Sequence, residues 1–553
     1  MASNTVIVKH KGKKYDVEIE PESTGEDFKL QLFSLTNVEP ARQKVLIKGG
    51  LLKDSDDLSA VGLKAGQVIM MIGQPEGGPG LVRPKSPIKF LEDMSEAEQA
   101  QRAGATPAGL VNLGNTCYLN ASLQTLRTIT ELQPALRDYK ASLSDAPNPS
   151  DMAAQLSTLY KQMSETQAAF PPMGLLTALR VAFPQFAERT KSNNAYAQQD
   201  AEEAWTHLVQ DIKRKVEVKG ERTSFVDKYM SGELVSTLEC DEQEALDGGE
   251  QAVTSHTPFQ KLVCHIDATI NHLRDGILAA LREKLEKKSE LLGRDAVYTK
   301  KSQISRAPKY LTVHFMRFFW KRETQKKAKI MRKVTFPQEL DIVEFCSDEL
   351  KKALVPVRDK VREVRKEEED IERARKRRKK TLDGDMSDVA GGAGLPADKE
   401  KKARDKGKTA QTTPDGDVVM GETYKTDAEI DAEKDAALLT AKKELNALID
   451  PTLRDDDGVN QSGIYELRGV VTHQGASADS GHYTAYVKKT APLDPKTGKS
   501  EAEDGKWWWF NDEKVSEVTV DKIEGLAGGG ESHSALILLY KAVPLPSSDG
   551  TVP

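Results

Sequence analysis

The sequence contains few cysteines, no long apolar run and no excess of positive charge. Its 553 residues include four cysteines, and none of them belongs to a CxxC pair. This usage argues against a disulfide framework and against a zinc site, and it favours a reducing compartment. No apolar run reaches the roughly 18 residues that a membrane span needs, and the first residues do not form a signal-peptide pattern. We therefore expect a soluble intracellular protein with no membrane partner.

The charge balance and the apolar content narrow the possibilities further. Lys and Arg number 80 and Asp and Glu number 86, which gives a formal net charge of −6. A dedicated nucleic-acid-binding protein usually has a clear basic excess, so we expect no nucleic-acid partner. Apolar residues make up only 38% and charged residues 30%, against a usual charged content of about 25%. The composition therefore predicts a real core together with long polar segments.

Residues 1–75 have the pattern of a small α+β domain. Alternation around Val6 and Val17 predicts two strands, and Phe28 and Leu32 begin a run with helical spacing. The segments VLIKGG and GQVIMMIG predict two more strands. The order strand, strand, helix, strand, strand suits a β-grasp, and this part of the chain resembles ubiquitin-like domains.

This segment departs from conjugated ubiquitin at its end. Gly77 and Gly78 run directly into Pro79, so no terminal diglycine is present and docking is the expected role. By the resemblance, Leu46 and Met71 lie on the sheet face that ubiquitin-like domains present to partners. The alternative is that both side chains belong to the core.

The rest of the chain divides by composition. Residues 76–105 are rich in Pro and Gly and predict a flexible linker, whereas residues 106–545 have a mixed α/β pattern. Periodicity predicts strands over 300–345. Helices are predicted over four segments: 117–129, 152–165, 199–216 and 268–288.

Residues 355–427 interrupt the second domain. The segment is dense in charge and then rich in Gly, Asp and Lys, so it cannot bury enough apolar surface to offset the entropy lost on ordering. We expect a helix over 364–380 that frays into disorder, and a further helix over 428–448. The six basic residues 375–380 form either a nuclear-import signal or a solvated helix face. We expect the protein in both cytoplasm and nucleus.

The stretch GLVNLGNTCYLN, residues 109–120, carries the most chemistry. Its turn-prone first half leads to Cys117, and Leu119 and Leu123 then lie on one helical face. Cys117 is thus predicted at the start of a helix, where the helix dipole and unpaired N–H groups stabilise a thiolate nucleophile. These N–H groups, with the amide of Asn112, could also hold an oxyanion. The alternative is a buried and inert cysteine.

A nucleophilic cysteine needs a base and a group that orients the base. His482 follows Gly481 and precedes an alternating strand, which fits a histidine facing a cleft. The aromatic run WWWF ends in Asn511 and Asp512, which can hydrogen-bond an imidazole N–H. An ordinary surface or core histidine and a turn-forming Asn-Asp pair are the alternatives.

Four segments together resemble the ubiquitin-specific protease family of deubiquitinases. They are GLVNLGNTCYLNASLQ, QQDAEE, GVVTHQGASADSGHYTAYV and WWWFNDEKVSEV, in the family's order. With the ubiquitin-like segment, the chain is most similar to proteasome-associated members. The resemblance implies an α+β chain in which a papain-like catalytic domain over 106–545 follows the β-grasp domain. It implies no cofactor, and no structural zinc, because Cys240 and Cys264 lack the partners of the family's zinc ribbon.

The resemblance also implies residue roles. Cys117 is the nucleophile, and His482 is its base and then the acid for the leaving lysine amine. Asn511 matches the residue that orients the histidine, a task that Asp512 could share, and Asn112 matches the oxyanion-stabilising amide. The tail of ubiquitin is implied to lie against two further residues: Gln199 and Asp200.

The function implied is thiol-dependent hydrolysis of isopeptide bonds at the C-terminal glycine of ubiquitin, through a thioester, on proteasome-bound substrates. The expected partners are ubiquitin, ubiquitinated proteins and, through the ubiquitin-like domain, the regulatory particle of the 26S proteasome. Residues 474–481 are implied to form a movable loop over the cleft. The alternative function is a non-catalytic ubiquitin-binding regulator of the proteasome, against which the intact Cys, His and Asn/Asp set argues.

Overall fold

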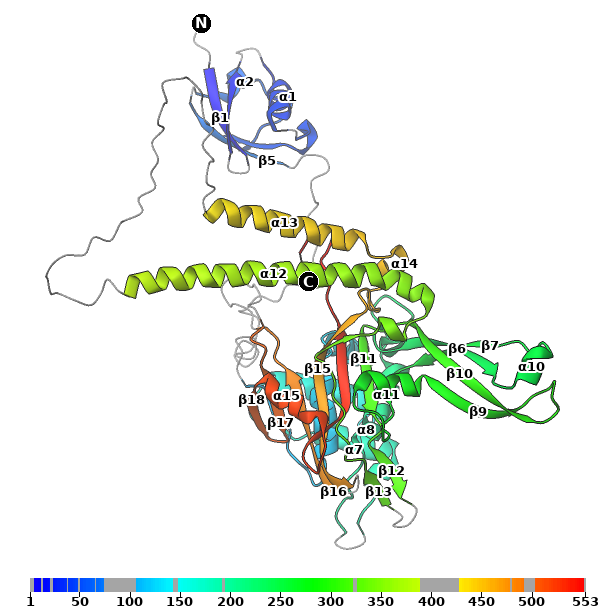
Figure 1. The fold of residues 1–553 in the computed structure, drawn as a ribbon. Coiled ribbons are helices and arrows are strands. Elements are labelled where there is room, and N and C mark those ends of the chain that lie inside the picture. The colour runs from blue at the N-terminus through cyan, green and yellow to red at the C-terminus, as the bar shows by residue number, and fades with distance from the viewer. Residues whose placement is uncertain are drawn as a thin grey trace, which may run out of the picture. The chain divides into compact units, whose positions relative to one another are not determined.

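A computed structural model shows two compact units, Met1–Phe90 and Leu91–Pro553 (Figure 1). The boundary falls in the predicted linker, which lies outside the described residues. The structure describes residues 4–10, 13–19, 23–36, 38–47, 50–64, 66–73, 106–142, 148–190, 194–321, 326–387, 427–477, 480–491 and 503–551.

The first unit is a β-grasp. Its elements are β1 (Asn4–His10), β2 (Lys13–Ile19), α1 (Gly25–Thr36), the 3-10 turn η1 (Pro40–Arg42), β3 (Lys44–Ile47), β4 (Gly50–Leu51), α2 (Leu58–Val61) and β5 (Val68–Ile72). The sheet has the order β2-β1-β5-β3-β4, and its central pair, β1 and β5, is parallel. Phe28 and Leu32 of α1 pack into the core against this sheet. The predicted order of strands and helix is confirmed.

Leu46 and Met71 lie on opposite faces of this sheet. Met71 is 2% exposed and belongs to the core, whereas Leu46 is 41% exposed. Successive residues of a strand alternate between faces, so Met70 and Ile72, each 55% exposed, share the outer face with Leu46. In register, Leu46 pairs with Met70. The prediction that Met71 lies on the face presented to partners is therefore wrong: its neighbour Met70 lies on that face, and Met71 belongs to the core.

The second unit begins with a helical layer. Its helices are α4 (Cys117–Leu126), α5 (Leu132–Ser142), α6 (Met152–Ser164), α7 (Met173–Ala182), η3 (Pro184–Ala187), α8 (Ala201–Lys215) and α9 (Phe225–Tyr229). Every residue of α4 is buried, because helices of this layer and strands of the neighbouring sheet share one core around it. The helices predicted over 117–129, 152–165 and 199–216 are confirmed.

A large sheet packs against this layer. Its strands run in the order β18-β17-β16-β15-β19-β11-β8. Their bounds are β8 (Leu262–Cys264), β11 (Tyr310–Phe315), β15 (Ile464–Ser477), β16 (Ser480–Lys488), β17 (Trp507–Asn511), β18 (Lys514–Val518) and β19 (Ser534–Ala542), with β12 (Phe318–Lys321), β13 (Lys326–Lys329) and β14 (Glu339–Asp341) off this path. Residues 474–477 and 480–481, predicted as loop, are the ends of the paired strands β15 and β16.

The remaining short elements lie around the sheets. They are α10 (Gln243–Asp247), α11 (Leu273–Ala280), η4 (Val343–Phe345), α14 (Pro451–Arg454), α15 (Val520–Glu524) and η5 (Gly525–Ala527).

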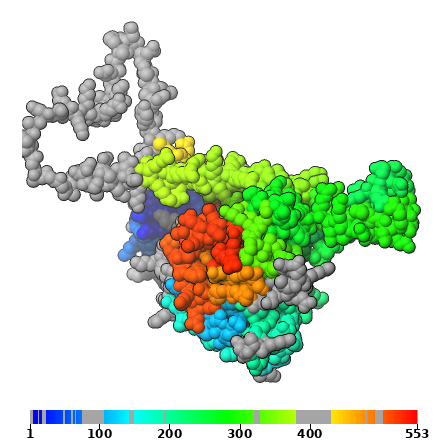
Figure 2. All heavy atoms as spheres, turned by 60° about the horizontal axis from the view of Figure 1, so that its bottom comes forward, coloured from blue at the N-terminus to red at the C-terminus, as the bar shows by residue number. Residues whose placement is uncertain are grey.

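A second sheet of this unit, β7-β6-β10-β9, projects as a separate lobe (Figure 2). Its strands are β6 (Gly232–Cys240), β7 (Val253–Phe259), β9 (Arg282–Lys288) and β10 (Asp295–Arg306). The helix predicted over 268–288 is wrong in its second half, which forms β9. Pairing of the β9 backbone with β10 overrides the helix propensity of its Lys and Glu residues.

The helix predicted over 364–380 is confirmed, but the disorder predicted for the rest of the insertion 355–427 is wrong for residues 355–363 and 381–387. Helix α12 (Asp348–Ser387) runs unbroken through them and lies beside α13 (Asp427–Ala447) (Figure 1). Helix α12 is ordered because an apolar stripe packs against α13 near one end of the pair. The high density of charged residues in the segment makes this stripe hard to recognise in the sequence. The stripe joins Val357, Val361 and Val364 of α12 to Ala441 and Leu445 of α13. Residues 388–426 lie outside the described part of the chain.

The basic run within α12 partly faces α13. Arg375 forms an ion pair with Asp435 at 2.7 Å, and Arg378 forms one with Asp431 at 2.6 Å. Arg375 and Arg378 therefore help to hold α12 against α13. A role of the run in nuclear import stays a prediction. Among the helices that the structure describes, α12 included, no stretch is both apolar and long enough to cross a membrane.

Candidate active site

Cys117 is the first residue of α4, and a structured turn leads into it. The side-chain oxygen of Asn112 accepts hydrogen bonds from the backbone N–H groups of Gly114, at 3.0 Å, and Thr116, at 3.2 Å. Gly114 and Asn115 both have positive φ angles, of 94° and 54°, which Gly and Asn tolerate best. The turn residues therefore hold the thiol at the N-terminus of the helix.

The Cys117 thiol is almost fully buried, at 3% exposure of the residue. Burial raises its pKa to about 11, although a hydrogen bond from the Tyr483 backbone opposes the shift, and the negative charge of Asp512 raises it further. The stabilised thiolate expected at a helix N-terminus is thus outweighed by desolvation. In this conformation the thiol is protonated at neutral pH. The contact with Tyr483 also places the thiol beside the residue that follows His482.

His482 lies at the start of β16 and contacts Asn511 at the end of β17. The distance from His482 Nε2 to Asn511 Oδ1 is 2.6 Å. An amide oxygen only accepts, so Nε2 carries the hydrogen and Nδ1 is left as the basic nitrogen. Antiparallel pairing of β16 with β17 brings the two strands together. This arrangement is the one that a general base requires.

Asp512 does not share the bond to His482 that Asn511 makes. It occupies the turn between β17 and β18, with φ of 52°. One of its carboxylate oxygens accepts from the side-chain amide of Asn112 at 2.9 Å, and the other accepts from that of Asn120 at 2.8 Å. The carboxylate therefore orients the amide that was predicted to hold the oxyanion.

Asn120 is a site residue that the sequence reasoning missed. It is 2% exposed and lies three residues after Cys117, on the next turn of α4. A polar amide among the apolar residues of a buried helix was the available signal, since buried polar groups require partners. A backbone hydrogen bond also joins the segment before α4 to the β17–β18 turn, because the N–H of Leu110 donates to the carbonyl oxygen of Asp512 at 3.0 Å.

Gln199 and Asp200 lie just before α8, and both are partly buried. Asp200 caps the helix, since its side chain accepts from the N–H of Glu202 at 3.0 Å. Helix α8 meets α4 where Ser122 Oγ approaches the carbonyl oxygen of Ala201, at 3.4 Å. The structure thus joins the predicted residues around Cys117 and His482 into one site. It places Gln199 and Asp200 next to that site, at the N-terminus of the neighbouring helix α8.

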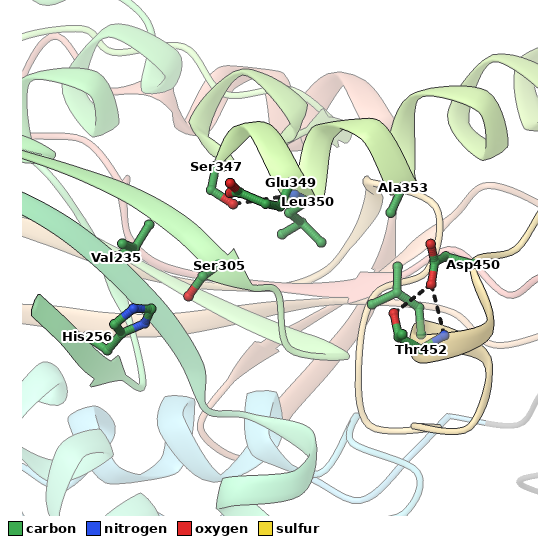
Figure 3. Close-up of a pocket in the computed structure, with 10 residues that line it drawn as sticks. Val235, His256, Ser305, Ser347, Glu349, Leu350, Ala353, Asp450 and Thr452 are labelled. Carbon is green, nitrogen blue, oxygen red and sulfur yellow. Dashed lines mark hydrogen bonds between the residues drawn. The ribbon is translucent and has the colours of Figure 1, made fainter. Parts of the chain in front are cut away.

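A separate cavity of about 620 Å³ lies between the start of α12, the projecting sheet and α14 (Figure 3). Its lining includes His256, Ser305, Glu349 and Asp450, and none of the predicted catalytic residues. Over the described ranges, no three His, Cys, Asp or Glu side chains gather as a metal ion would require.

Comparison with known proteins decides the family. The family model described as Ubiquitin carboxyl-terminal hydrolase matches residues 108–540. The chain belongs to this family. These hydrolases are cysteine-type deubiquitinases, so the chain is an enzyme that removes ubiquitin. A second model, described as Ubiquitin family, matches residues 5–76, in agreement with the β-grasp unit.

Relatives of this deubiquitinase match along nearly the whole chain. Ubiquitin carboxyl-terminal hydrolase 6 of Schizosaccharomyces pombe is 42% identical over 537 residues, which cover 97% of this chain and 98% of the relative. Ubiquitin carboxyl-terminal hydrolase 6 of Arabidopsis thaliana is 36% identical, with the same two coverages. Ubiquitin carboxyl-terminal hydrolase 14 of Caenorhabditis elegans is 32% identical, covering 97% of this chain and 93% of the relative.

Proposed function

We propose that this deubiquitinase hydrolyses the isopeptide bond after the last glycine of ubiquitin through a thioester on Cys117, on substrates bound to the proteasome. The observation that carries the proposal is the 2.6 Å contact between His482 and Asn511. Tyr483, the residue after His482 on β16, contacts the Cys117 thiol. A cysteine, an oriented imidazole and an amide held near the helix N-terminus are the parts that acyl transfer needs.

The steps follow from these positions. His482 Nδ1 accepts the thiol proton while Asn511 holds Nε2, and the thiolate sulfur attacks the carbonyl carbon. The Asn112 amide, held by Asp512, donates to the oxyanion that forms. His482 then gives its proton to the lysine amine as the C–N bond breaks, and water hydrolyses the thioester by the same route.

The buried thiol indicates that the free enzyme must open before it cuts. With 3% exposure and a pKa near 11, Cys117 can neither reach a substrate nor ionise readily. Opening of the cleft over Cys117 would expose the thiol, remove the desolvation penalty and lower the pKa. The proposed cover is the loop expected at residues 474–481, of which the structure describes 474–477 and 480–481 as the ends of β15 and β16.

The outer face of the β-grasp sheet is the proposed docking surface for the regulatory particle of the proteasome. Leu46, Met70 and Ile72 expose apolar side chains there, and Val68 and Leu51 are 53% and 51% exposed. A contiguous apolar patch on a small domain is typical of a protein interface. Docking would hold the catalytic unit near ubiquitinated substrates.

Hydrolysis of a ubiquitin-amide reporter tests the catalytic part. Cys117→Ala is expected to abolish turnover while ubiquitin still binds, and a ubiquitin C-terminal electrophile should label the wild type but not the variant. Normal turnover by Cys117→Ala would refute the assignment. An unlabelled wild type would favour the alternative of a non-catalytic ubiquitin-binding regulator.

The proteasome part needs a second comparison. Co-purification with the proteasome, and reporter hydrolysis with and without purified proteasome, are measured for the full chain, for Met70→Glu on the outer face and for Leu30→Glu as a control. Leu30 is on α1 and is 50% exposed. Met70→Glu is expected to lose co-purification with the proteasome, whereas Leu30→Glu retains it. Equal retention by both variants would rule out this docking face.

A further inference from the structure

His473 is a histidine in the interior of the second unit whose ring has no described polar partner. The residue is 0% exposed, and neither ring nitrogen has a hydrogen-bond partner among the described residues. Buried polar groups without a partner are rare in folded proteins, and each one calls for a specific reason.

The ring lies beneath the hairpin end that carries His482. In the β15–β16 pairing, Gln474 lies opposite His482 and His473 lies opposite Tyr483. A Cβ added to Gly481 would lie 2.5 Å from His473 Nε2, and one added to Gly475 would lie 3.6 Å from His473 Cε1. The imidazole, together with the carbonyl oxygen of Gln474, therefore occupies the space that a side chain at Gly481 would need, and it lies at van der Waals distance from the corresponding position at Gly475.

Strand pairing alone does not determine the shape of this hairpin end. The register shifts between Gln474 and Ser477. Gly475 and Gly481 have φ angles of 119° and 147°, a region that glycine visits most easily. The pairs Gln474–His482 and Ser477–Ser480 and a hydrogen bond from the N–H of Gly475 to the carbonyl oxygen of Glu531, at 2.9 Å, hold parts of this end. Between those pairs the ladder is irregular, so a packed side chain beneath the glycines can further fix the position of the chain just before His482.

His473 is itself held firmly. Its ring makes edge contacts with the rings of Phe318, at 5.2 Å between centroids, and Tyr483, at 4.7 Å. Its carbonyl oxygen accepts from Lys329 Nζ at 2.7 Å and from Ser534 Oγ at 3.4 Å. The ring is thus packed between β12 and β16, while β13 and β19 hold the backbone of the same residue, so the ring can support the hairpin end in the conformation that the structure shows.

We propose that His473 is a positioning residue for the reaction, whose ring supports Gly475 and Gly481 and thereby sets the place of His482 relative to Cys117. Tyr483 completes the link, because its ring contacts His473 and its backbone contacts the thiol. The inference rests on the proposed role of His482 as the base.

A neutral ring suits this role. Burial, together with the positive charge of nearby Lys329, lowers the pKa of His473 to about 3, so the ring stays uncharged at ordinary assay pH. It therefore supports the hairpin without placing a second positive charge beside His482 when that residue carries the thiol proton.

Two substitutions in the full-length chain test the proposal. Phenylalanine in His473→Phe overfills the space under the glycines, and alanine in His473→Ala leaves it empty, so both shift His482. A misplacement of about 1 Å costs on the order of 100-fold in rate. We expect kcat for a ubiquitin-amide reporter to fall on that order in His473→Phe, with KM unchanged because the buried ring cannot touch ubiquitin.

Val471→Ala is the matched control. Val471 lies two residues earlier on β15, so its side chain is on the same face, and it is also 0% exposed. Its truncation removes core packing but no support under the glycines, so kcat should hold while the unfolding temperature falls. Comparing kcat with the unfolding temperature in all three variants separates positioning from general destabilisation.

Three results would overturn the proposal: unchanged kcat in both His473 variants, a loss seen only as a higher KM, or a loss no larger than in a Val471→Ala protein of equal unfolding temperature. If the His473 variants do not fold, Phe318→Leu carries the test, since it removes one of the two ring contacts. It should lower kcat by a smaller factor with KM unchanged, and an unchanged kcat counts against the proposal.

His482→Ala in the same assay separates this inference from the proposed mechanism. Retained activity in His482→Ala would refute the role of His482 itself. Lost activity there, together with full activity in the His473 variants, would refute only the positioning role.

Discussion

The active site and the α12–α13 helix pair are held together in different ways. At the site, the exposed amide of Asn112 and the buried amide of Asn120 meet one carboxylate, that of Asp512, across 400 and 392 residues of sequence. In the helix pair, an apolar stripe covers one end, and beyond it the described contacts include ion pairs between exposed side chains such as Arg375 and Asp435.

Because the two regions are held by different interactions, substitutions in them are expected to affect different properties of the enzyme. A carboxylate whose two oxygens each accept from a positioned amide makes charge-assisted bonds with defined geometry, and a small error there displaces reacting groups. Exposed ion pairs are worth roughly 0–1 kcal/mol each and are weakened by salt. Substitutions at the site should therefore change turnover, and substitutions in the helix pair should change local unfolding.

The largest expected effect concerns ionisation of Cys117. For a pKa of about 11, only about one thiol in 1000 is ionised at pH 8, and alkylation by iodoacetamide should rise about tenfold per pH unit up to pH 10. Mass spectrometry of the Cys117 peptide measures the rate. Cys264 and Cys346, whose pKa values burial raises to about 12, are internal controls. Rapid, pH-independent alkylation near pH 7 would show that the site is open in the free enzyme.

Separate substitution of Asn511 and Asp512 sharpens the account of the site. Asp512→Ala removes the carboxylate that orients the side-chain N–H groups of Asn112, while its oxygen stays bonded to Gly114 and Thr116, and it should lower kcat about 100-fold, the scale of one lost oxyanion donor. Asn511→Ala removes the partner of His482 and should also change the shape of the pH profile of kcat/KM, whereas Asp512→Ala should preserve it. Steady-state kinetics from pH 5 to about pH 9 distinguish them. An altered profile only in Asp512→Ala would reverse the two roles.

Leu445→Ala tests the helix pair. Leu445 is 2% exposed within the α12–α13 stripe, and truncation of such a residue costs about 2–5 kcal/mol. Backbone hydrogen exchange in α12 and α13 should accelerate, while kcat on a ubiquitin-amide reporter stays unchanged. Lys443→Ala, on the exposed side of α13, is the control and should change neither. A large fall in kcat for Leu445→Ala would show that the two regions are coupled.

The smallest effect is expected for Arg375→Ala. Loss of its exposed pair with Asp435 should cost no more than about 1 kcal/mol, and 1 M salt should remove the difference from wild type. Hydrogen exchange of α13 at low and high salt measures it, with Lys376→Ala, whose described partner Glu372 lies on the same helix, as a comparison. A salt-independent loss would mean that packing, not charge, holds the far end of the pair.

The sequence by itself determined the features that local patterns encode. The spacing of Phe28 and Leu32 and the alternation of the flanking strands predict the β-grasp, and the run from Asn112 to Cys117 predicts a thiol at a helix start. Four family segments then identify the chemistry. Each of these patterns depends on residues that are close together in the sequence, so it can be recognised without knowing how the chain packs.

Only the tertiary structure decided which of two adjacent residues contacts the catalytic histidine and which of two adjacent methionines is exposed. Asn511 and Asp512 differ by one position, yet one meets His482 and the other meets Asn112, and Met70 rather than Met71 faces outward. The high pKa of Cys117 and the order of α12 likewise depend on burial against distant segments. A sequence window does not contain those partners, because strand pairing and core packing bring them together only in the folded chain.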